Sequence, residues 1–298
     1  MSPNVSIITP TANRAAFLPA IARCVARQQA DWEWLVLDDS PEPNAFMRDL
    51  AQRDARVRYL WSSEPMTIGA KRNRLVSEAR GELIAHFDDD DHYASHYLAD
   101  MTALLRQNDA ALIKLSTFWM YAPHTRFLGY MDLNARVGLH YVLKGQEVST
   151  VTFHEKMQIG ADFILFYGFA YLYRKSLFEI ARFDDVNLGE DESFIRRVVS
   201  ADKNVLAAED ARGSCLHLIH PASTSRCFSR HSLPDFLLPK LFPEYEGYPL
   251  PVEAQLSRLF SRASRRPGRP RRRYLPPDAD ARCLRSGRSG TDGIRARR

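Results

Sequence analysis

The chain has 298 residues, of which 45% are hydrophobic and 26% charged, the composition of a globular protein with a sizeable core. Residues 258–298 hold 14 arginines, no lysine and three aspartates, so the rest of the chain is acidic, with 27 basic and 33 acidic side chains. This acidic body argues against a general nucleic-acid-binding domain, and no apolar run approaches the roughly 18–20 residues that span a bilayer.

Strand and helix patterns alternate along the N-terminal part of the chain. Short apolar runs predict strands over Val5–Thr11, Trp32–Ser40, Val57–Trp61 and Gly81–Phe87. Amphipathic spacing predicts helices over Phe17–Gln29, Asn44–Arg53 and Ile68–Arg80. This alternation with short connections predicts an α/β fold, with a mostly parallel central sheet flanked by helices.

Polar motifs follow three of the predicted strands: TPTANR, LDDS and FDDDD. Ligands bind beyond the carboxyl ends of the strands in open parallel sheets, so we expect the three motifs to form one site. For Asp38 and Asp39, one interpretation is an Asx turn before Pro41. The other is a carboxylate that accepts from a nucleotide base or a ribose hydroxyl.

The aspartate run, Asp88–Asp91, has two interpretations. It is either a solvated acidic turn or a site for a hard cation such as Mg²⁺ or Mn²⁺, which prefers carboxylate oxygens and leaves room for phosphate. We favour the cation, because the preceding strand places the carboxylates at the ligand-binding edge and a cation would relieve their repulsion. The run lacks the glycine and later glutamate of an EF-hand loop.

Three cations, Lys71, Arg72 and Arg74, lie in the first turns of a predicted helix. Cations are disfavoured there by the helix dipole, so their presence indicates a bound anion such as a nucleotide. The alternative is an exposed, solvated helix face.

The segment between Leu115 and Tyr173 is rich in aromatic residues, most of which we expect to pack in the core. Alternating residues predict a strand over Phe169–Ser176, and a helix is predicted over Asp191–Ser200. Asp191 is either the N-cap of that helix or a catalytic group, and one residue can serve as both. His217 and His220 are either structural or partners of a metal or phosphate.

These motifs together resemble the inverting, GT-A-fold glycosyltransferases of family 2, from about Val5 to Arg226. VSIITPTANR is similar to the family's first nucleotide-binding strand and turn, and LVLDDS to its second motif. The resemblance implies nucleotide contacts from Thr9, Pro10, Thr11, Arg14 and Asp39, the last on the base. The family's usual glycine–serine after the second motif is replaced here by Ser40-Pro41.

The segment GAKRNRLVSEARGELIAHFDDDD closely matches the family's helix, strand and DxD motif. The resemblance implies Asp90 as the main metal ligand, Asp88 as a supporting ligand and Asp89 on the ribose. It also implies that Lys71 and Arg72 assist the departing diphosphate. The register stays open, because each of the three aspartates fits a DxD role.

The later segments resemble the acceptor side of the same family. GFAYLYRKSLFEIARFDDVNLGEDESFIRR is similar to the strand that leads to the general base, which implies Asp191 for that role. IHPASTS is similar to the family's late histidine segment, which favours His220 over His217 as a metal ligand.

The resemblance implies a non-processive, hexosyltransferase-type enzyme that uses Mn²⁺ or Mg²⁺. It would move a sugar by single displacement from a nucleotide diphosphate sugar to a hydroxyl of a glycan or lipid-linked acceptor, in surface polysaccharide or glycan synthesis. No nucleic-acid partner is expected. One alternative is a catalytically silent sugar-nucleotide-binding protein. The other is a nucleotidyltransferase, although TPTANR lacks the glycine-rich loop expected of one.

We expect a Rossmann-like nucleotide-sugar-binding half over residues 1–115 and an acceptor-binding, catalytic-base half of the same domain over residues 116–250. Residues 251–298 are expected to form a basic amphipathic helix and a disordered tail, either a solvated extension or a peripheral contact with an anionic membrane. The N-terminus lacks a signal-peptide pattern and the cysteines lack metal-ligand spacing, so we expect a cytoplasmic protein, with the inner membrane face as the candidate surface for the tail. The cysteines are Cys24, Cys215, Cys227 and Cys283.

Overall fold

The computed structural model describes residues 3–134, 137–144, 147–154, 166–221, 223 and 227–247. Contacts divide the chain into a compact unit, Met1–Leu256, and a second unit, Ser257–Arg298. The second unit lies outside the described residues, as does the predicted amphipathic helix that starts near Val252. Among the described residues, no helix is both long and apolar enough to cross a bilayer.

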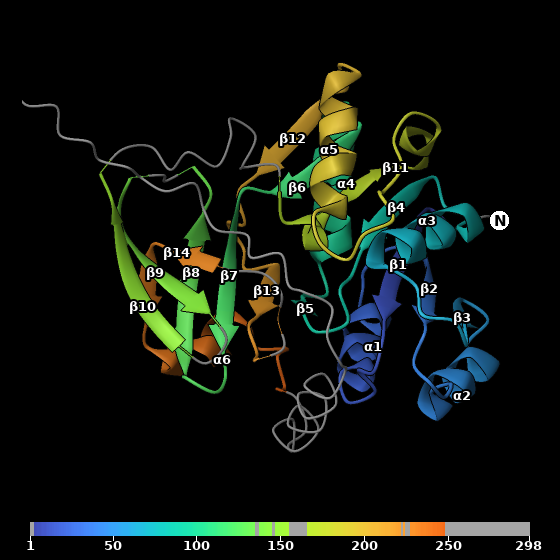
Figure 1. The fold of residues 1–298 in the computed structure, drawn as a ribbon, viewed down its shortest axis with the longest axis horizontal. Helices are drawn as coiled ribbons and strands as arrows, with labels where there is room; N and C mark the ends of the chain where they lie inside the picture. The colour runs from blue at the N-terminus through green and yellow to red at the C-terminus, as the bar shows by residue number, and fades with distance from the viewer. Residues whose placement is uncertain are drawn as a thin grey trace, which may run out of the picture. The chain divides into compact units, whose positions relative to one another are not determined.

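A seven-stranded sheet forms the centre of the compact unit (Figure 1). Its strands are β1 (Val5–Thr11), β2 (Trp32–Asp38), β3 (Val57–Trp61), β4 (Leu83–His86), β6 (Leu112–Leu115), β11 (Leu172–Arg174) and β12 (Val205–Ala208). They lie in the order β12-β6-β11-β4-β1-β2-β3, and β11 is antiparallel to both of its neighbours while the other pairs are parallel. The prediction of an α/β fold with a mostly parallel sheet is confirmed.

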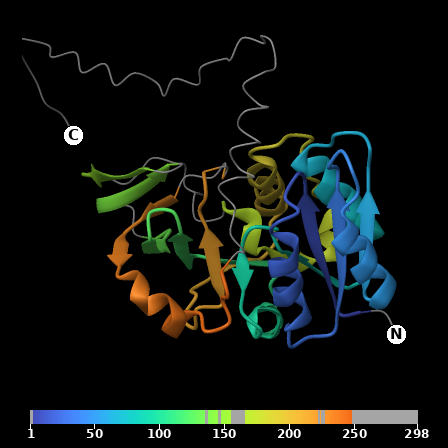
Figure 2. The same cartoon turned by 90° about the horizontal axis from the view of Figure 1, so that it is seen from below.

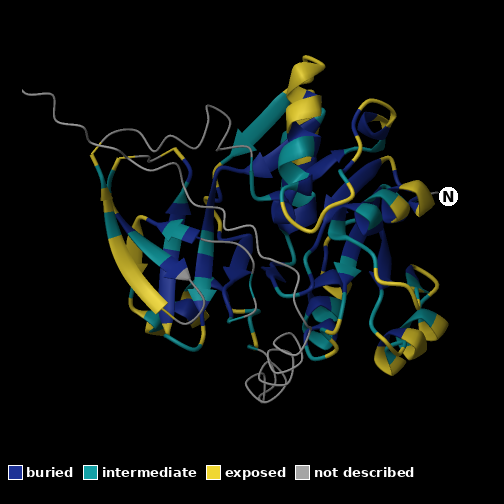
Figure 3. Ribbon diagram, in the orientation of Figure 1, coloured by how far each residue is buried: buried dark blue, intermediate teal, exposed yellow. Residues whose placement is uncertain are grey.

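Helices cover both faces of this sheet, which explains why its strands are apolar on both sides. The helices that cover it are α1 (Leu18–Ala26), α2 (Ala45–Arg53), α3 (Ile68–Glu78), α4 (Tyr97–Gln107) and α5 (Glu190–Ser200). The short α6 (Leu238–Leu241) packs instead with Leu128, Leu216 and Leu218 of a separate sheet. Successive residues of β1 face opposite layers: Ile7 packs in one cluster with α1 and α4, whereas Ile8 packs in another with α3 and α5. Figure 3 shows the buried strands between helices with exposed outer surfaces.

The turn between α3 and β4 is longer than the sequence predicted. The helix ends at Glu78 instead of Arg80, and the strand begins at Leu83 instead of Gly81. The Gly81 N–H donates to the buried Ser6 Oγ at 2.8 Å, and a Cβ at residue 81 would lie 2.6 Å from the Ser6 nitrogen. A buried polar side chain of β1 therefore sets this turn, and such a contact leaves no mark on a hydrophobicity pattern.

Two further sheets lie beside the central sheet, and strands β7 to β10 are seen to one side of it in Figures 1 and 2. The five-stranded sheet, of order β15-β8-β7-β13-β5, contains β5 (His92–Tyr93), β7 (Thr117–Ala122), β8 (Phe127–Asp132), β13 (Cys215–Leu218) and β15 (His231–Leu233). The three-stranded sheet, of order β10-β9-β14, contains β9 (Gly138–Lys144), β10 (Glu147–Phe153) and β14 (Cys227–Ser229). Because β5 pairs with β13, the chain just after the aspartate run lies beside the strand that carries His217.

The predicted strand over Phe169–Ser176 is mostly replaced by tight helical turns. Only Leu172–Arg174 form a strand, β11, and 3₁₀ turns cover Gly168–Ala170 and Lys175–Glu179 on either side. The aromatic residues of this part of the chain pack into the core, with Tyr171 and Tyr173 completely buried. The chain thus bends sharply just before β11, and this bend contributes to the site described next.

Candidate active site

The carboxyl ends of β1, β2 and β4 meet at one edge of the central sheet, as the sequence predicted. β1 lies between the other two strands, and Thr11 at its end is opposite Asp38 of β2. The aspartate run follows β4, and Thr11 Oγ1 donates to Asp89 Oδ2 at 2.6 Å. The three polar motifs therefore form one constellation.

Thr9 lies inside the core instead of lining this site. Its hydroxyl donates to the Phe87 carbonyl at 2.8 Å and accepts from Trp34 Nε1 at 2.9 Å, and the residue is 0% exposed. The predicted nucleotide contact from the Thr9 side chain is thus corrected: the side chain joins β1 to β2 and to the turn after β4. Pro10, the next residue, is half-buried at the strand end.

Asp38 and Asp39 have different hydrogen-bond partners. Asp38 forms the Asx turn, since its Oδ1 accepts from the Ser40 N–H at 2.9 Å and its Oδ2 from Tyr59 Oη at 2.7 Å. Asp39 instead accepts from Lys71 Nζ at 2.6 Å and from the Met66 N–H at 2.7 Å. Both carboxylates are fixed in place, and Asp39 is tied to α3.

The N-terminus of α3 is closed by protein groups. Its first N–H groups donate within the protein: Ile68 to Asn187 Oδ1 (3.0 Å), Gly69 to the Val186 carbonyl (3.1 Å) and Ala70 to Thr67 Oγ1 (3.0 Å). Lys71 and Arg72 are buried and bonded to carboxylates, while Arg74 is exposed. The anions that account for Lys71 and Arg72 are therefore protein side chains, and the sequence pattern could not distinguish these from a ligand.

Each member of the aspartate run has its own set of partners. The bonds are Arg72 Nη2 to Asp88 Oδ1 (3.2 Å), Thr11 Oγ1 to Asp89 Oδ2 (2.6 Å), Arg14 Nη1 to Asp89 Oδ1 (3.2 Å) and to Asp90 Oδ2, His220 Nε2 to Asp90 Oδ2 (2.8 Å) and His217 Nδ1 to Asp91 (2.9 Å). The solvated-turn interpretation is therefore wrong, because each carboxylate is bonded to a cation, an imidazole or a hydroxyl.

The carboxylates of the run also differ in proton affinity. Burial raises the pKa of Asp89 to about 7, against the charge of Arg14. Burial acts on Asp90 in the same direction, but Arg14 and His220 outweigh it and hold the Asp90 pKa below its ordinary value. Burial raises the pKa of Asp91 to about 6 against the charge of His217. Burial and neighbouring cations thus act in opposite directions on these carboxylates.

The donor set suits a hard divalent cation, because carboxylate oxygens and one imidazole nitrogen are ligands that Mn²⁺ and Mg²⁺ accept. In this structure the Arg14 guanidinium bridges Asp89 and Asp90, and His220 is bonded to the same Asp90 oxygen. Within the residues that the structure describes, no three His, Cys, Asp or Glu side chains are already arranged as a metal site. A cation would therefore compete with Arg14 for these carboxylates.

Asp191 lies in the first turn of α5 and is joined to the aspartate run through Arg72. Arg72 donates to Asp88 on one side and to Glu190 Oε1 at 2.5 Å on the other, and Glu190 directly precedes Asp191. Asp191 is not the N-cap, because α5 begins at Glu190 after Gly189, whose φ of +85° favours glycine. Asp191 Oδ2 instead accepts from the Gly168 N–H at 2.8 Å.

The two histidines have different surroundings. His217 is bonded to Asp91, which also accepts from the Leu218 N–H at 2.9 Å, and its ring stacks on Phe169. His220 is bonded to Asp90 at the end of the run that meets Arg14. The Asp91–His217 pair was missed by the sequence reasoning, and the available signal was a fourth aspartate in a motif that needs at most three.

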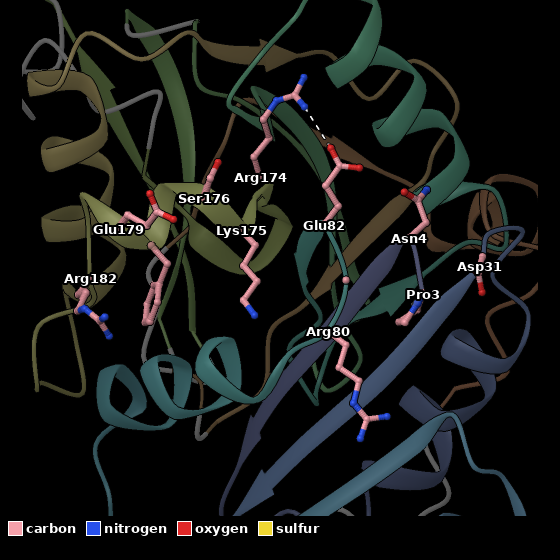
Figure 4. A pocket seen from close by; sticks show the side chains of 12 residues that line it. Pro3, Asn4, Asp31, Arg80, Glu82, Arg174, Lys175, Ser176, Glu179 and Arg182 are labelled. Atoms are coloured by element: carbon pink, nitrogen blue, oxygen red, sulfur yellow. Dashed lines mark hydrogen bonds and ion pairs between the residues drawn. The ribbon is translucent and has the colours of Figure 1, made fainter. Parts of the chain in front are cut away.

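A hollow lies at the opposite, amino-terminal edge of the sheet (Figure 4). It measures about 770 Å³ and is lined by residues that precede β1 and β4, among them Asn4 and Glu82. Its cations are interspersed with carboxylates, and Arg174 is bonded to Glu82 at 3.4 Å. The strand ends that bind ligands in such sheets are the carboxyl ends, so the aspartate run and not this hollow is the candidate active site.

Comparisons with known proteins identify the family of the chain and its fold. The chain matches the family model described as Glycosyl transferase family 2 over residues 6–177. It is 28% identical over 200 residues to the Uncharacterized glycosyltransferase EpsJ of Bacillus subtilis (strain 168), which covers 65% of this chain and 55% of that protein. It is 30% identical over 117 residues to the O-antigen biosynthesis protein RfbC of Myxococcus xanthus, 37% of this chain and 9% of that protein. The chain thus spans about half of the first relative and a small part of the second.

Two solved structures share the fold at low sequence identity. The mannosyltransferase PcManGT from Pyrobaculum calidifontis, in complex with GDP-Man and Mn²⁺, superposes with a TM-score of 0.51 at 16% identity, over 73% of this chain and 57% of that chain. S. aureus TarS 1-349, in complex with UDP, superposes with a TM-score of 0.54 at 16% identity, over 88% of this chain and 72% of that chain.

Proposed function

Because the chain belongs to glycosyl transferase family 2 and has the GT-A fold, we propose that it transfers a sugar from a nucleoside diphosphate sugar to an acceptor hydroxyl. One observation carries this proposal: Arg72 joins the aspartate run to the helix turn that carries Asp191. In this proposal the aspartate run serves the donor side and Asp191 serves the acceptor side.

Asp191 is the proposed general base. Its Oδ2 is fixed by the Gly168 N–H, and its Oδ1 accepts from the Glu192 N–H at 2.9 Å, so the carboxylate has a defined orientation. The acceptor oxygen forms a bond to the anomeric carbon while its proton passes to Asp191. The bond from that carbon to the diphosphate oxygen breaks, and its electron pair leaves with the nucleoside diphosphate. A single displacement of this kind inverts the anomeric centre.

Mn²⁺ or Mg²⁺ is the proposed cofactor, with Asp88, Asp90 and His220 as the residues that would hold it. When bound, it would offset the charge that develops on the departing diphosphate. The structural neighbour PcManGT is in complex with GDP-Man and Mn²⁺, which supports the choice of metal and donor class. If the metal displaced Arg14 from Asp90, the Arg14 guanidinium would be free to face the diphosphate.

The nucleotide itself is proposed to contact Pro10, Thr11, Arg14, Asp39 and Asp89. These residues lie at or just after the ends of β1 and β2 and in the aspartate run. Thr9 and Arg72 are bonded to other residues: Thr9 to Phe87 and Trp34, and Arg72 to Asp88 and Glu190. Lys71 Nζ donates both to Asp39 and to the Thr11 carbonyl, the latter at 2.8 Å, so it fixes the two motifs relative to each other.

A glycan or lipid-linked acceptor in surface polysaccharide synthesis is the proposed setting. The name of RfbC, an O-antigen biosynthesis protein, supports this setting. Contact of residues 251–298 with an anionic membrane is proposed from their arginine content alone. Co-sedimentation with anionic liposomes tests that contact, and equal binding by full-length protein and a chain truncated at Ser261 would contradict it.

The central test combines a binding assay with a turnover assay on the full-length protein. UDP-glucose, UDP-GlcNAc and GDP-mannose are screened by thermal shift with and without Mn²⁺, and release of the nucleoside diphosphate is then measured. We expect Asp191→Asn to lower release about 10²–10⁴-fold while keeping the Mn²⁺-dependent shift. Asp109→Asn is the matched control, since the Asp109 side chain is 96% exposed at the other edge of the sheet.

Two outcomes would contradict the proposal. A full rate of release by Asp191→Asn would remove the assigned base. Stabilisation of the wild type without any release would favour a silent sugar-nucleotide-binding protein.

A further inference from the structure

Lys114 is a completely buried lysine in the apolar strand β6, whose sequence is LIKL. A buried charged side chain needs a specific partner to offset its lost hydration. Lys114 Nζ donates to the main-chain carbonyl of Phe166 and lies 5.9 Å from the centre of the Tyr167 ring. The catalytic steps proposed above make no use of this lysine.

The partner of Lys114 belongs to a strained turn, Phe166–Gly168. Tyr167 has a φ of +67°, in the left-handed region that bulky side chains avoid, so the surrounding contacts must hold it there. Lys114 binds the carbonyl of Phe166, the first residue of the turn. His86 binds the carbonyl of Gly168, the last residue of the turn, where its Nδ1 donates at 2.8 Å.

The same turn contacts Asp191. The Gly168 N–H donates to Asp191 Oδ2 at 2.8 Å, and a Cβ at residue 168 would lie 2.7 Å from the Asp191 Cβ. Burial lowers the pKa of Lys114 to about 7, while the charge of Asp191 acts in the opposite direction. Lys114 is therefore connected to Asp191 in two ways, through the turn and through its charge.

We propose that Lys114 is a positioning residue for the general base: by holding the Phe166 carbonyl it fixes the strained Tyr167 and aims the Gly168 N–H at Asp191. The inference rests on the proposed role of Asp191. The oriented Oδ2 is then ready for the acceptor proton, because the turn does not have to reorganise during the reaction.

Replacement of Lys114 by methionine is the principal test, made in the full-length protein. Methionine fills a similar volume and removes a buried charge, so the fold is expected to be retained. With Mn²⁺ and the nucleotide sugar that stabilises the wild type among UDP-glucose, UDP-GlcNAc and GDP-mannose, we expect Lys114→Met to lower kcat for donor hydrolysis about tenfold to 100-fold. KM and the nucleotide-dependent thermal shift are expected to stay unchanged. Lys114→Leu gives a second apolar variant, should the methionine protein not fold.

Lys114→Gln separates positioning from mere stability. Glutamine keeps an N–H donor for the Phe166 carbonyl, so this variant is expected to recover most of the lost kcat. In an Asp191→Asn background, Lys114→Met is expected to cause no further loss, because both changes act on one group.

The outcomes distinguish this inference from the proposed function. Two results would overturn the role of Lys114 and leave that of Asp191 intact. One is a wild-type kcat in the apolar Lys114 variants. The other is that Lys114→Met lowers kcat by the same factor in the Asp191→Asn protein as in the wild type. Wild-type release by Asp191→Asn alone would overturn both.

Discussion

The two edges of the central sheet both gather arginines that bridge carboxylates, but they differ in burial. At the carboxyl edge, Arg72 bridges Asp88 and Glu190, and the side chains of Arg72 and Glu190 are 5% and 7% exposed. At the amino edge, Arg174 bridges Glu82 and Asp109, and the side chains of Arg174 and Asp109 are 31% and 96% exposed. The contacts are of the same kind. They differ in energetic consequence because of burial: a charge withdrawn from water lowers the stability of the fold unless its charged partners are in place.

The largest expected effect is the loss of the buried bridge. Arg72→Met leaves Asp88 and Glu190 without their shared cation, and we expect a loss of about 3–5 kcal/mol in the free energy of unfolding. Arg174→Met at the other edge is expected to cost about 1 kcal/mol or less. Urea unfolding of both variants measures the difference, and equal losses would break the comparison.

The next test replaces each of two closely packed glycines by alanine. Gly168→Ala places a Cβ 2.7 Å from the Asp191 Cβ, and we expect turnover to fall about 100-fold through displacement of that carboxylate. Gly81→Ala at the other edge meets the Ser6 nitrogen at 2.6 Å, so it should lower stability while the folded protein keeps its kcat. Turnover per folded molecule separates the two, and a comparable loss of turnover in Gly81→Ala would count against the distinction.

Two buried hydroxyls provide a finer test. Thr11→Val removes the bond to Asp89, and Ser6→Ala removes the bonds to Glu33 and Gly81. Each change is expected to cost about 1–3 kcal/mol of stability, because a buried polar group loses its partner. Only Thr11→Val should weaken Mn²⁺-dependent binding of the nucleotide sugar, as measured by titration calorimetry. Weaker binding by Ser6→Ala would contradict the assignment of the site to one edge.

The smallest effects are expected in the hollow at the amino edge. Arg80 and Arg182 are exposed there, so Arg80→Gln and Arg182→Gln should each change stability by no more than about 0.5 kcal/mol. Turnover should not change. A loss of donor hydrolysis in either variant would show that this hollow contributes to the reaction.

Much of the central sheet could be predicted because its information is local. The strand over Val5–Thr11 and the helix that starts at Ile68 agree with the structure, since buried strands and amphipathic helices leave periodic apolar patterns. The meeting of the three strand ends also follows from a rule that holds for parallel sheets in general.

The partners of individual side chains could not be predicted in the same way. Lys71 and Arg72 looked like groups for an external anion, but carboxylates distant in the chain fill that place, Asp39 for one and Glu190 for the other. Asp191 was a candidate N-cap, but α5 begins one residue before it, at Glu190, and Gly189 with its positive φ is the N-cap. The Asp91–His217 bond joins residues separated by 126 positions. Such pairings depend on tertiary geometry, which no local pattern records.

The loop that closes the N-terminus of α3 has a mechanical consequence. Through Val186 and Asn187 it takes up two N–H groups of α3, and the same loop runs directly into α5. Pulling the two helices apart would strip those N–H groups of their acceptors, a cost that adds to breaking the Arg72–Glu190 contact. α3 and α5 are thus held together at both the loop and the Arg72–Glu190 ion pair, so separating them would break both sets of contacts.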